Sequence, residues 1–345
     1  MLAAALGAAL TYGTSDPPSG GRGRPVELAF APGASWAEVA DALGAAGLVS
    51  LPSAFAAYAR ARGGAAPAGK HFVPDDLRPA ELYAALTRSP SRRRVRVTWP
   101  EGATRFDVAR RLGERGVIAP GAFLEASADR ALLALAGVEA PTAEGYLFPD
   151  TYEYFVNADA ASSLAPPLKG FRRALERLRA EGLEPPGEAA RALGWSTHEA
   201  VTLASMVEKE ASADDERPLV ASVFYNRFRS PAFAPKPPRL QSDPTAAYGC
   251  LAAPATPSCA GFAGRVTPAI AHDPANPYST YAHAGLPPGP IANPGLKALR
   301  AAMAPASTGY LYFVAAGGGR HTFSATLGEH NAAVRQLRGL RGGSP

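Results

Sequence analysis

The residue of this chain best suited to acid–base chemistry is a glutamate at the end of an apolar predicted helix. In VTLASMVEKEA (residues 201–211), Glu210 follows Met206 by four positions and Val207 by three, so it continues the buried helix face. Burial raises the pKa of a carboxyl group and keeps its proton in place near neutral pH, as a general acid requires. Glu208 points to another side. The alternative is a solvated helix end with surface ion pairs.

Polar and aromatic side chains suited to sugar binding follow this helix in turn-rich segments. Sugars are bound by aromatic platforms together with amide and carboxylate hydrogen bonds, so these residues would suit a carbohydrate groove. The set comprises Asn226, Gln241, Asp243, Tyr248, Tyr278, Tyr281, Asn293, His321 and Phe323. For each residue alone a structural role is the alternative, because Asn in Pro-rich turns often only binds the backbone.

The two cysteines, Cys250 and Cys259, have eight residues between them. In an oxidising compartment we expect one local disulfide that closes a loop. The alternative is two unrelated buried thiols. No pair of His lies near them and the six His show no H-E-x-x-H spacing, so we expect no metal site and no cofactor. G-x-S-x-G, P-loop and dinucleotide-binding patterns are also missing from the sequence.

An internal echo in the N-terminal third predicts two strand–helix units. Residues 26–49 (VELAFAPGASWAEVADALGAAGLV) align with residues 95–118 (VRVTWPEGATRFDVARRLGERGVI) when Gly33 is placed on Gly102. Each unit has an alternating strand, a Gly turn, a Ser or Thr N-cap with an acidic residue three positions later, and a helix stopped by Gly. Such units suit a small binding module. Ordinary α+β packing without a ligand is the alternative.

Further helices and strands are predicted along the chain, before and after the helix that ends at Glu210. We expect a strand at 70–74 and a helix at 78–86, then helices at 168–182, 189–193, 196–210 and 220–228, a hairpin of 310–314 with 321–324, and a last helix at 327–337. This mixture predicts an α+β fold. The long turn-rich segment 278–295 has a length typical of functional loops.

Length and composition limit the classes of function that this chain can have. The 345 residues suffice for two or three domains, and 47% hydrophobic residues are ample for a folded core. The net charge of +5 rests mostly on scattered Arg. Without an aromatic-basic face or a nucleic-acid motif, we expect no nucleic-acid partner; an anionic cell-envelope polymer or a membrane surface suits the charge.

The N-terminal residues 1–12 (MLAAALGAALTY) are apolar but only about half as long as a membrane span. A Ser/Gly/Pro-rich linker, residues 13–24, follows them. We interpret residues 1–24 as the remnant of an anchor or signal plus its linker. A short signal peptide and a frayed start are the alternatives.

Eight segments, in this order and spacing, resemble the endolytic murein transglycosylase family (YceG-like) across residues 144–335. They are EGYLFPDTY (144–152), ASMVEKEA (204–211), ERPLVASVFYNRF (216–228), LQSDPTAAYG (240–249), YSTY (278–281), GLPPGPIANPG (285–295), ALRAAMAPASTGYLYFV (298–314) and HTFSATLGEHNAAV (321–334). The Pro-rich stretch 230–239 and the loop between the cysteines depart from the expected pattern.

The resemblance implies an enzyme held in the cell inner membrane and facing the periplasm. It would cut nascent peptidoglycan between N-acetylmuramic acid and N-acetylglucosamine and leave 1,6-anhydro ends. The family's catalytic glutamate is the second Glu of the Glu-Lys-Glu element, which is Glu210 here. Expected partners are glycan strands and peptidoglycan synthases, with membrane contact only through the N-terminal anchor. We therefore predict three regions: the remnant 1–24, a LysM-like module region 25–138, and a catalytic domain 139–340.

One carboxyl group suffices for this chemistry. Glu210 protonates the glycosidic oxygen and then takes the proton from the sugar's own 6-hydroxyl, which attacks C1. Glu144 and Asp243 would orient the sugar or assist the developing charge. Two rival hypotheses are a muramidase-type hydrolase, which needs a second catalytic carboxylate, and a non-catalytic peptidoglycan-binding scaffold.

Overall fold

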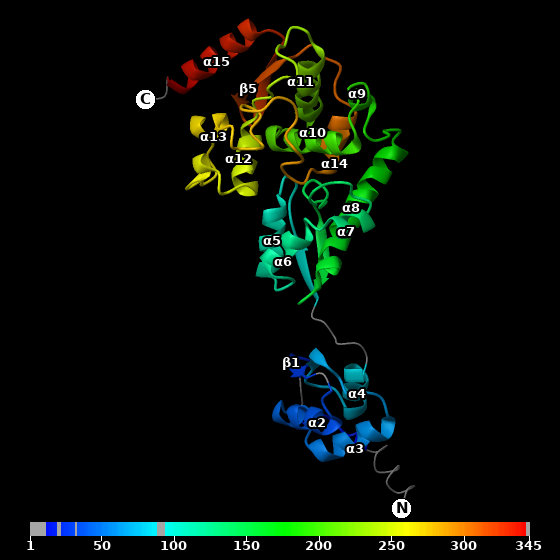
Figure 1. Ribbon diagram of the computed structural model, residues 1–345. Helices are drawn as coiled ribbons and strands as arrows, with labels where there is room; N and C mark the ends of the chain where they lie inside the picture. The colour runs from blue at the N-terminus through cyan, green and yellow to red at the C-terminus, as the bar shows by residue number, and fades with distance from the viewer. Residues whose placement is uncertain (1–11, 19–21, 32, 88–93, 343–345) are drawn as a thin grey trace, which may run out of the picture. The chain divides into compact units, whose positions relative to one another are not determined.

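The computed structural model (Figure 1) describes residues 12–18, 22–31, 33–87 and 94–342. The chain divides into two compact units, Met1–Arg94 and Val95–Pro345. Most of the predicted anchor, residues 1–11, lies outside the described residues. In the described part of the chain, no helix combines the length and the apolar character needed to cross a membrane.

The smaller unit is a two-stranded antiparallel sheet covered by three helices. Its elements are β1 (Pro25–Phe30), α2 (Trp36–Ala45), α3 (Pro52–Arg62), β2 (Gly69–Pro74) and α4 (Pro79–Thr87). β1 and β2 pair in a register that places Val26 opposite Val73. Ser35 and Glu38 form the predicted capping box at the start of α2. The buried face of this helix, with Val39 and Leu43, packs into the unit's own hydrophobic core.

The second echo unit belongs to the larger unit. It consists of β3 (Arg94–Thr98) and α5 (Arg105–Glu114), with the predicted capping box between Thr104 and Asp107. α6 (Pro120–Ala126), α7 (Arg130–Leu135) and β4 (Thr151–Phe155) follow, and β4 pairs with β3. Leu112 of α5 lies in the same hydrophobic core as Met206. The units therefore separate at residues 94 and 95, earlier than the predicted boundary after residue 138, because the apolar face of α5 packs with the later helices.

The remaining elements are mostly helices. They are α8 (Ala160–Ala180), α9 (Glu188–Arg191), α10 (Thr197–Glu210), α11 (Arg217–Arg229), α12 (Asp243–Ala252), α13 (Pro268–His272) and α14 (Leu296–Met303), the short 3-10 helices η1 (Asp214–Glu216) and η2 (Pro257–Cys259), the hairpin β5 (Tyr312–Gly317) and β6 (Arg320–Ser324), and α15 (Leu327–Gly342). The α+β class is confirmed. α8 begins earlier than predicted, because Asp159 caps it and the helix passes through Pro166 and Pro167.

α10 is the central helix of the larger unit. Residues 200–207 are all buried, so the helix is enclosed on every side instead of presenting one apolar stripe. It packs against α11, α12 and α14, and Figure 1 shows α10 below α11 with α14 beside it. The capping box of Ser196 and Glu199 fixes its first turn. Its last residue, Glu210, therefore projects from a rigid, buried support.

Candidate functional site

As whole residues, both glutamates of the Glu-Lys-Glu element are half-buried, but they have different partners. The Glu208 side chain is only 5% exposed and accepts a 3.1 Å ion-pair hydrogen bond from Arg217, itself 7% exposed. Glu208 also accepts from the backbone N–H of Gly295 at 3.0 Å. The prediction that only Glu210 lies on the buried side was wrong in this respect. Glu208 is buried as well, and its charge is neutralised by a cation nine residues along the chain.

Glu210 has no such cation in direct contact among the described residues. Its Oε1 accepts a 2.6 Å hydrogen bond from the Ser242 hydroxyl. Burial raises the pKa of Glu210, because the charged form loses its hydration. The Ser242 bond lowers that pKa and the negative charge of Asp243 raises it, whereas His321 and Arg227 lower it. Glu210 thus combines a raised pKa with neighbours that stabilise its anion, as an acid that later acts as a base needs.

Ser242 is placed by an unusual backbone. It is the N-cap residue of α12, yet its hydroxyl does not cap that helix and bonds to Glu210 instead. The preceding Gln241 has φ of 52°, in the left-handed region that non-glycine residues seldom occupy. The Ser242 N–H donates to Oγ1 of Thr280 at 3.0 Å, and the Thr245 hydroxyl donates to the Ser242 carbonyl at 2.6 Å. The segment around Thr280 thereby holds Ser242 toward α10.

Arg227 supplies a buried positive charge near Glu210. Its Nε donates to the carbonyl of Leu311 at 2.8 Å and its Nη1 to that of Leu240 at 2.6 Å. Burial lowers the pKa of Arg227 to about 10, while Glu210 acts in the opposite direction. The guanidinium lies 5.1 Å from the ring centre of Phe233, within cation–π range. It remains a fixed cation at neutral pH.

Asn226 and His321 are held by the protein around this charge. The Asn226 amide donates to the carbonyls of Thr308 and Tyr310, at 2.8 and 3.0 Å. The His321 Nδ1 lies 2.8 Å from Oε2 of buried Glu216, which also accepts the His321 backbone N–H. Glu216 therefore fixes the orientation of the imidazole.

The aromatic residues predicted for sugar binding lie in two groups. Phe323 packs near His321, with 6.2 Å between ring centres. The Tyr278 ring packs edge-on against that of Tyr248 in α12, with 4.8 Å between ring centres. The Tyr281 hydroxyl donates to Asp243 at 2.7 Å. Gln241 and Asp243 are exposed at the start of α12.

Glu144 and Asn293 need a correction, because both are enclosed by the protein. Glu144 is 1% exposed and Asn293 is 0% exposed. Glu144 accepts hydrogen bonds from the Arg105 backbone N–H at 2.9 Å, the Tyr248 hydroxyl at 2.9 Å and the Asn293 amide at 3.0 Å. Burial raises the pKa of Glu144 to about 7, although the hydrogen bonds from Arg105 and Tyr248 lower it. Direct contact with a substrate was predicted for both residues, and their enclosure instead gives them a role in positioning segments.

Sequence reasoning missed Ser242, Arg227, Glu216 and Arg217 as members of this site. Ser242 and Arg227 stand inside segments already singled out, LQSDPTAAYG and NRF. A Ser directly before an Asp-Pro helix start reads as an ordinary N-cap, so its long-range bond carries no local signal. Within the described ranges, no cluster of three or more His, Cys, Asp or Glu could hold a metal ion, and independence from metal stays a prediction.

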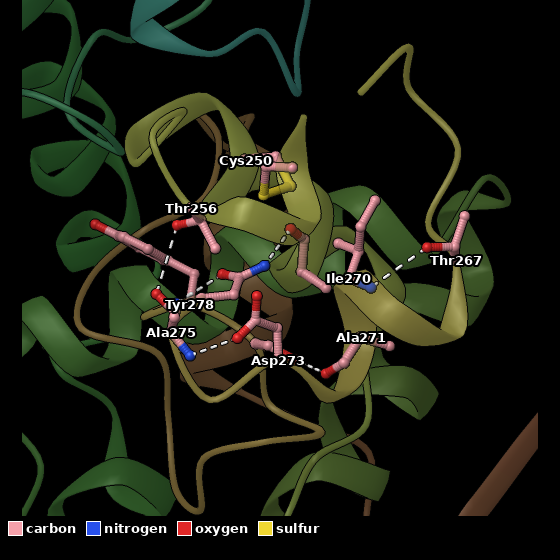
Figure 2. The surroundings of a disulfide bond; sticks show 12 residues. Cys250, Thr256, Thr267, Ile270, Ala271, Asp273, Ala275 and Tyr278 are labelled. Carbon is pink, nitrogen blue, oxygen red and sulfur yellow. Dashed lines mark hydrogen bonds between the residues drawn. A yellow bond between two sulfur atoms is a disulfide. The ribbon is translucent and has the colours of Figure 1, made fainter. Parts of the chain in front are cut away.

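The structure contains a disulfide between Cys250 at the end of α12 and Cys259 of η2, with 5.2 Å between their Cα atoms (Figure 2). The bond lies in a small hydrophobic cluster with Ala246 and Ile270. In Figure 2, Ile270 and Thr267 of the α13 start are joined by a hydrogen bond, at 3.3 Å. The disulfide thus closes a folded subregion beside α12.

Comparison with known proteins gives consistent matches. The sequence model of the YceG-like family matches residues 28–336. A Bacillus subtilis (strain 168) protein named endolytic murein transglycosylase is 36% identical over 193 residues, covering 55% of this chain and 46% of that protein. A Streptococcus pneumoniae (serotype 2, strain D39) protein of the same name is 27% identical over 323 residues, covering 84% of this chain and 54% of that protein.

A crystal structure of a YceG-like protein from Listeria monocytogenes superposes with a TM-score of 0.54 and 25% identity, covering 90% of this chain and 99% of that one. The chain spans about half the length of the curated relatives it matches, with 46% and 54% of those proteins aligned.

Proposed function

The chain belongs to the YceG-like family, and from this premise we propose that it is an endolytic lytic transglycosylase of peptidoglycan. It would cut nascent glycan strands between N-acetylmuramic acid and N-acetylglucosamine and leave 1,6-anhydro-muramyl ends. The observation that carries the proposal is the state of Glu210. This carboxyl group has a raised pKa, projects from the end of the central helix and accepts a hydrogen bond from Ser242.

Glu210 acts first as the general acid. The Ser242 hydroxyl bonds to Oε1, so we assign the carboxyl proton to Oε2, which accepts no hydrogen bond from the described residues. Oε2 is therefore the atom that protonates the glycosidic oxygen as the bond to the muramyl C1 breaks. The pKa of Glu210, raised by burial, keeps this proton available at a pH where an exposed glutamate would have lost it.

Glu210 acts next as the base. Its carboxylate accepts the proton of the 6-hydroxyl on the same muramyl ring, and the 6-oxygen attacks C1 to close the anhydro ring. The nucleophile is tethered to the reacting carbon, so its effective concentration is high and no second carboxylate must hold a water molecule. Ser242, Arg227 and His321 all favour the anionic form of Glu210, so they stabilise the carboxylate that the first step leaves.

We also propose a location facing the periplasm, where an oxidising environment would maintain the disulfide between Cys250 and Cys259. Anchoring in the inner membrane through the N-terminal segment remains a proposal, as does a LysM-like role in glycan binding for the smaller unit. Peptidoglycan synthases are the proposed protein partners, since the substrate is the strand that they make.

The decisive experiment is a digest of uncrosslinked glycan strands with the wild-type protein and with Glu210→Gln, followed by mass spectrometry of the products. We expect anhydro-muramyl ends from the wild type and a loss of at least about 10²-fold in turnover for the variant. Reducing muramyl ends would show a hydrolase instead. Equal strand lengths with both proteins and with no protein added would show a non-catalytic scaffold.

A further inference from the structure

A groove lies next to the start of α12 in the larger unit. It has a volume of about 800 Å³ and lies between α12 and the segment that follows the disulfide. Its apolar lining is provided mainly by Pro244, Ala247, Leu251, Phe262 and Val266, and its cations are Lys209 and Arg265. Leu251 is 41% exposed, although it is a large aliphatic side chain. The groove thus offers water-exposed apolar surface together with positive charge.

The groove begins next to Glu210 on two separate elements. Lys209 precedes Glu210 on α10, and Asp243 follows the Ser242 that bonds to Glu210; both line the groove. The groove is therefore lined by the immediate chain neighbours of Glu210 and of its hydrogen-bond partner Ser242. A group attached to the sugar that reacts at Glu210 can therefore extend into it.

The far wall of the groove is part of the disulfide-closed subregion. Phe262 and Val266 pack against the cluster that contains Cys250, Cys259 and Ile270. Figure 2 shows how this subregion is tied together, including the 2.8 Å bond from the Ala275 N–H to Asp273. The wall is therefore pre-formed, which lowers the entropic cost of binding a flexible ligand.

The charges available in the groove favour an anion. Arg265 is exposed, and the described residues place no carboxylate within ion-pair distance of it. Lys209 donates to the carbonyl of Gly102 at 3.3 Å and keeps further N–H donors for a ligand. The one carboxylate lining the groove, Asp243, accepts a hydrogen bond from the Tyr281 hydroxyl. The groove thus presents two cations, and its single carboxylate already accepts a hydrogen bond.

We propose that this groove binds the acidic stem peptide carried by the muramyl residue whose C1 is attacked. This inference rests on the proposed function. The peptide is attached through the lactyl group on C3 of the same sugar ring, so it leaves the ring close to the reacting carbon. Its small alanyl side chains match the lining of Pro244, Ala247 and Leu251, and its free carboxylates match Arg265 and Lys209. The groove therefore makes the enzyme select strands that retain their peptides.

The test compares two forms of one substrate. Uncrosslinked glycan strands with intact pentapeptides, and the same strands stripped of peptides by an amidase, are digested by the wild type, by Arg265→Glu and by Arg130→Glu. Arg130 is also exposed and does not line the groove, which makes it a matched control. We expect wild-type kcat/KM to be about 10-fold higher on peptide-bearing strands, and Arg265→Glu to remove that preference, while Arg130→Glu retains it.

A binding measurement separates this inference from the proposed function. Calorimetric titration of the Glu210→Gln protein with a disaccharide that carries its peptide, and with the peptide-free disaccharide, needs no turnover. Tighter binding of the peptide form, weakened about 10-fold by adding Arg265→Glu, supports the groove even if the wild type cuts no strand. Equal binding of the two disaccharides, or an equal effect of Arg265→Glu on both, overturns the groove assignment even if strands are cut.

Discussion

The Ser242 hydroxyl donates a 2.6 Å hydrogen bond to Glu210 across 32 positions of sequence. The bond joins the last residue of α10 to the residue before α12, so two separately folded elements define one proton-transfer group. Asp243, the next residue after Ser242, acts on the pKa of Glu210 in the opposite direction. Two adjacent side chains therefore tune one carboxyl group with opposite signs.

This opposition predicts a pair of pH profiles. A general acid works only while protonated, so kcat/KM declines as the pH rises through the pKa of Glu210. Ser242→Ala removes a bond that lowers this pKa, and the alkaline limb should move to higher pH. Asp243→Asn removes a charge that raises it, and the limb should move to lower pH. Shifts of the same sign in profiles of peptidoglycan cleavage would contradict the assignment.

The ion pair of Glu208 and Arg217 should be costly to break from one side. Both side chains are almost fully buried, at 5% and 7% exposed, so Arg217→Met leaves an uncompensated buried carboxylate. We expect the larger unit to lose about 3–5 kcal/mol in free energy of unfolding, measured with urea. The double variant Glu208→Gln/Arg217→Met should recover part of this loss.

The control for that measurement is the pair of Arg110 and Glu114, which have side chains 56% and 57% exposed and are 2.6 Å apart. Arg110→Met should leave the free energy of unfolding nearly unchanged, because water and salt screen an exposed pair. Equal losses for Arg110→Met and Arg217→Met would show that the burial of Glu208 does not govern its energetics.

The raised pKa of Glu144 predicts how stability depends on pH. Its pKa rises from an ordinary value of 4.5 to about 7 on folding, so the folded protein holds a proton that the unfolded chain has released between these values. Stability from this group is full below about 4.5 and is lost as the pH rises toward about 7, by on the order of 3 kcal/mol. Glu144→Gln should flatten this slope in urea titrations at pH 5 and pH 8; an unchanged slope would assign it to other groups.

Reduction of the disulfide should loosen the far wall of the groove. Cys250 and Cys259 are nine residues apart, and a crosslink of this loop length contributes about 2–3 kcal/mol by restricting the unfolded chain. We expect Cys250→Ser/Cys259→Ser to lower the Tm and to raise amide exchange in residues 260–272. The parent protein in a reducing buffer should behave as the double variant does, and a Tm insensitive to both changes would contradict the prediction.

Features that depend on interactions within a few residues were predicted from local sequence patterns. The capping boxes of the two strand–helix units and the C-terminal hairpin follow from spacing within a few residues. The burial of Glu208 could not be predicted in this way, because its partners Arg217 and Gly295 reach it only after α10 has packed.

Glu144 and Asn293 show that burial caused by residues far apart in the sequence also cannot be predicted from local patterns. Asn293 and Glu144 have side chains typical of sugar sites, and their type alone favoured substrate contact. Their burial depends on the meeting of segments 149 positions apart, which no local pattern records. The second echo likewise resembles the first in sequence but shares its hydrophobic core with α10.

The hydrogen bonds of Asn293 have a consequence for how the larger unit opens. Its carbonyl oxygen accepts the N–H groups of Gly145 and Leu147, and its amide donates to Ala103 and Glu144. Separating any one of these segments breaks bonds to the others, so opening here is all-or-none. Residues 102–105, 144–147 and 293 should form a single cooperative unit in native-state hydrogen exchange, with one shared opening free energy. The unit formed by β3 and α5 would then unfold together with α10 and the helices packed against it, and not as a separate module.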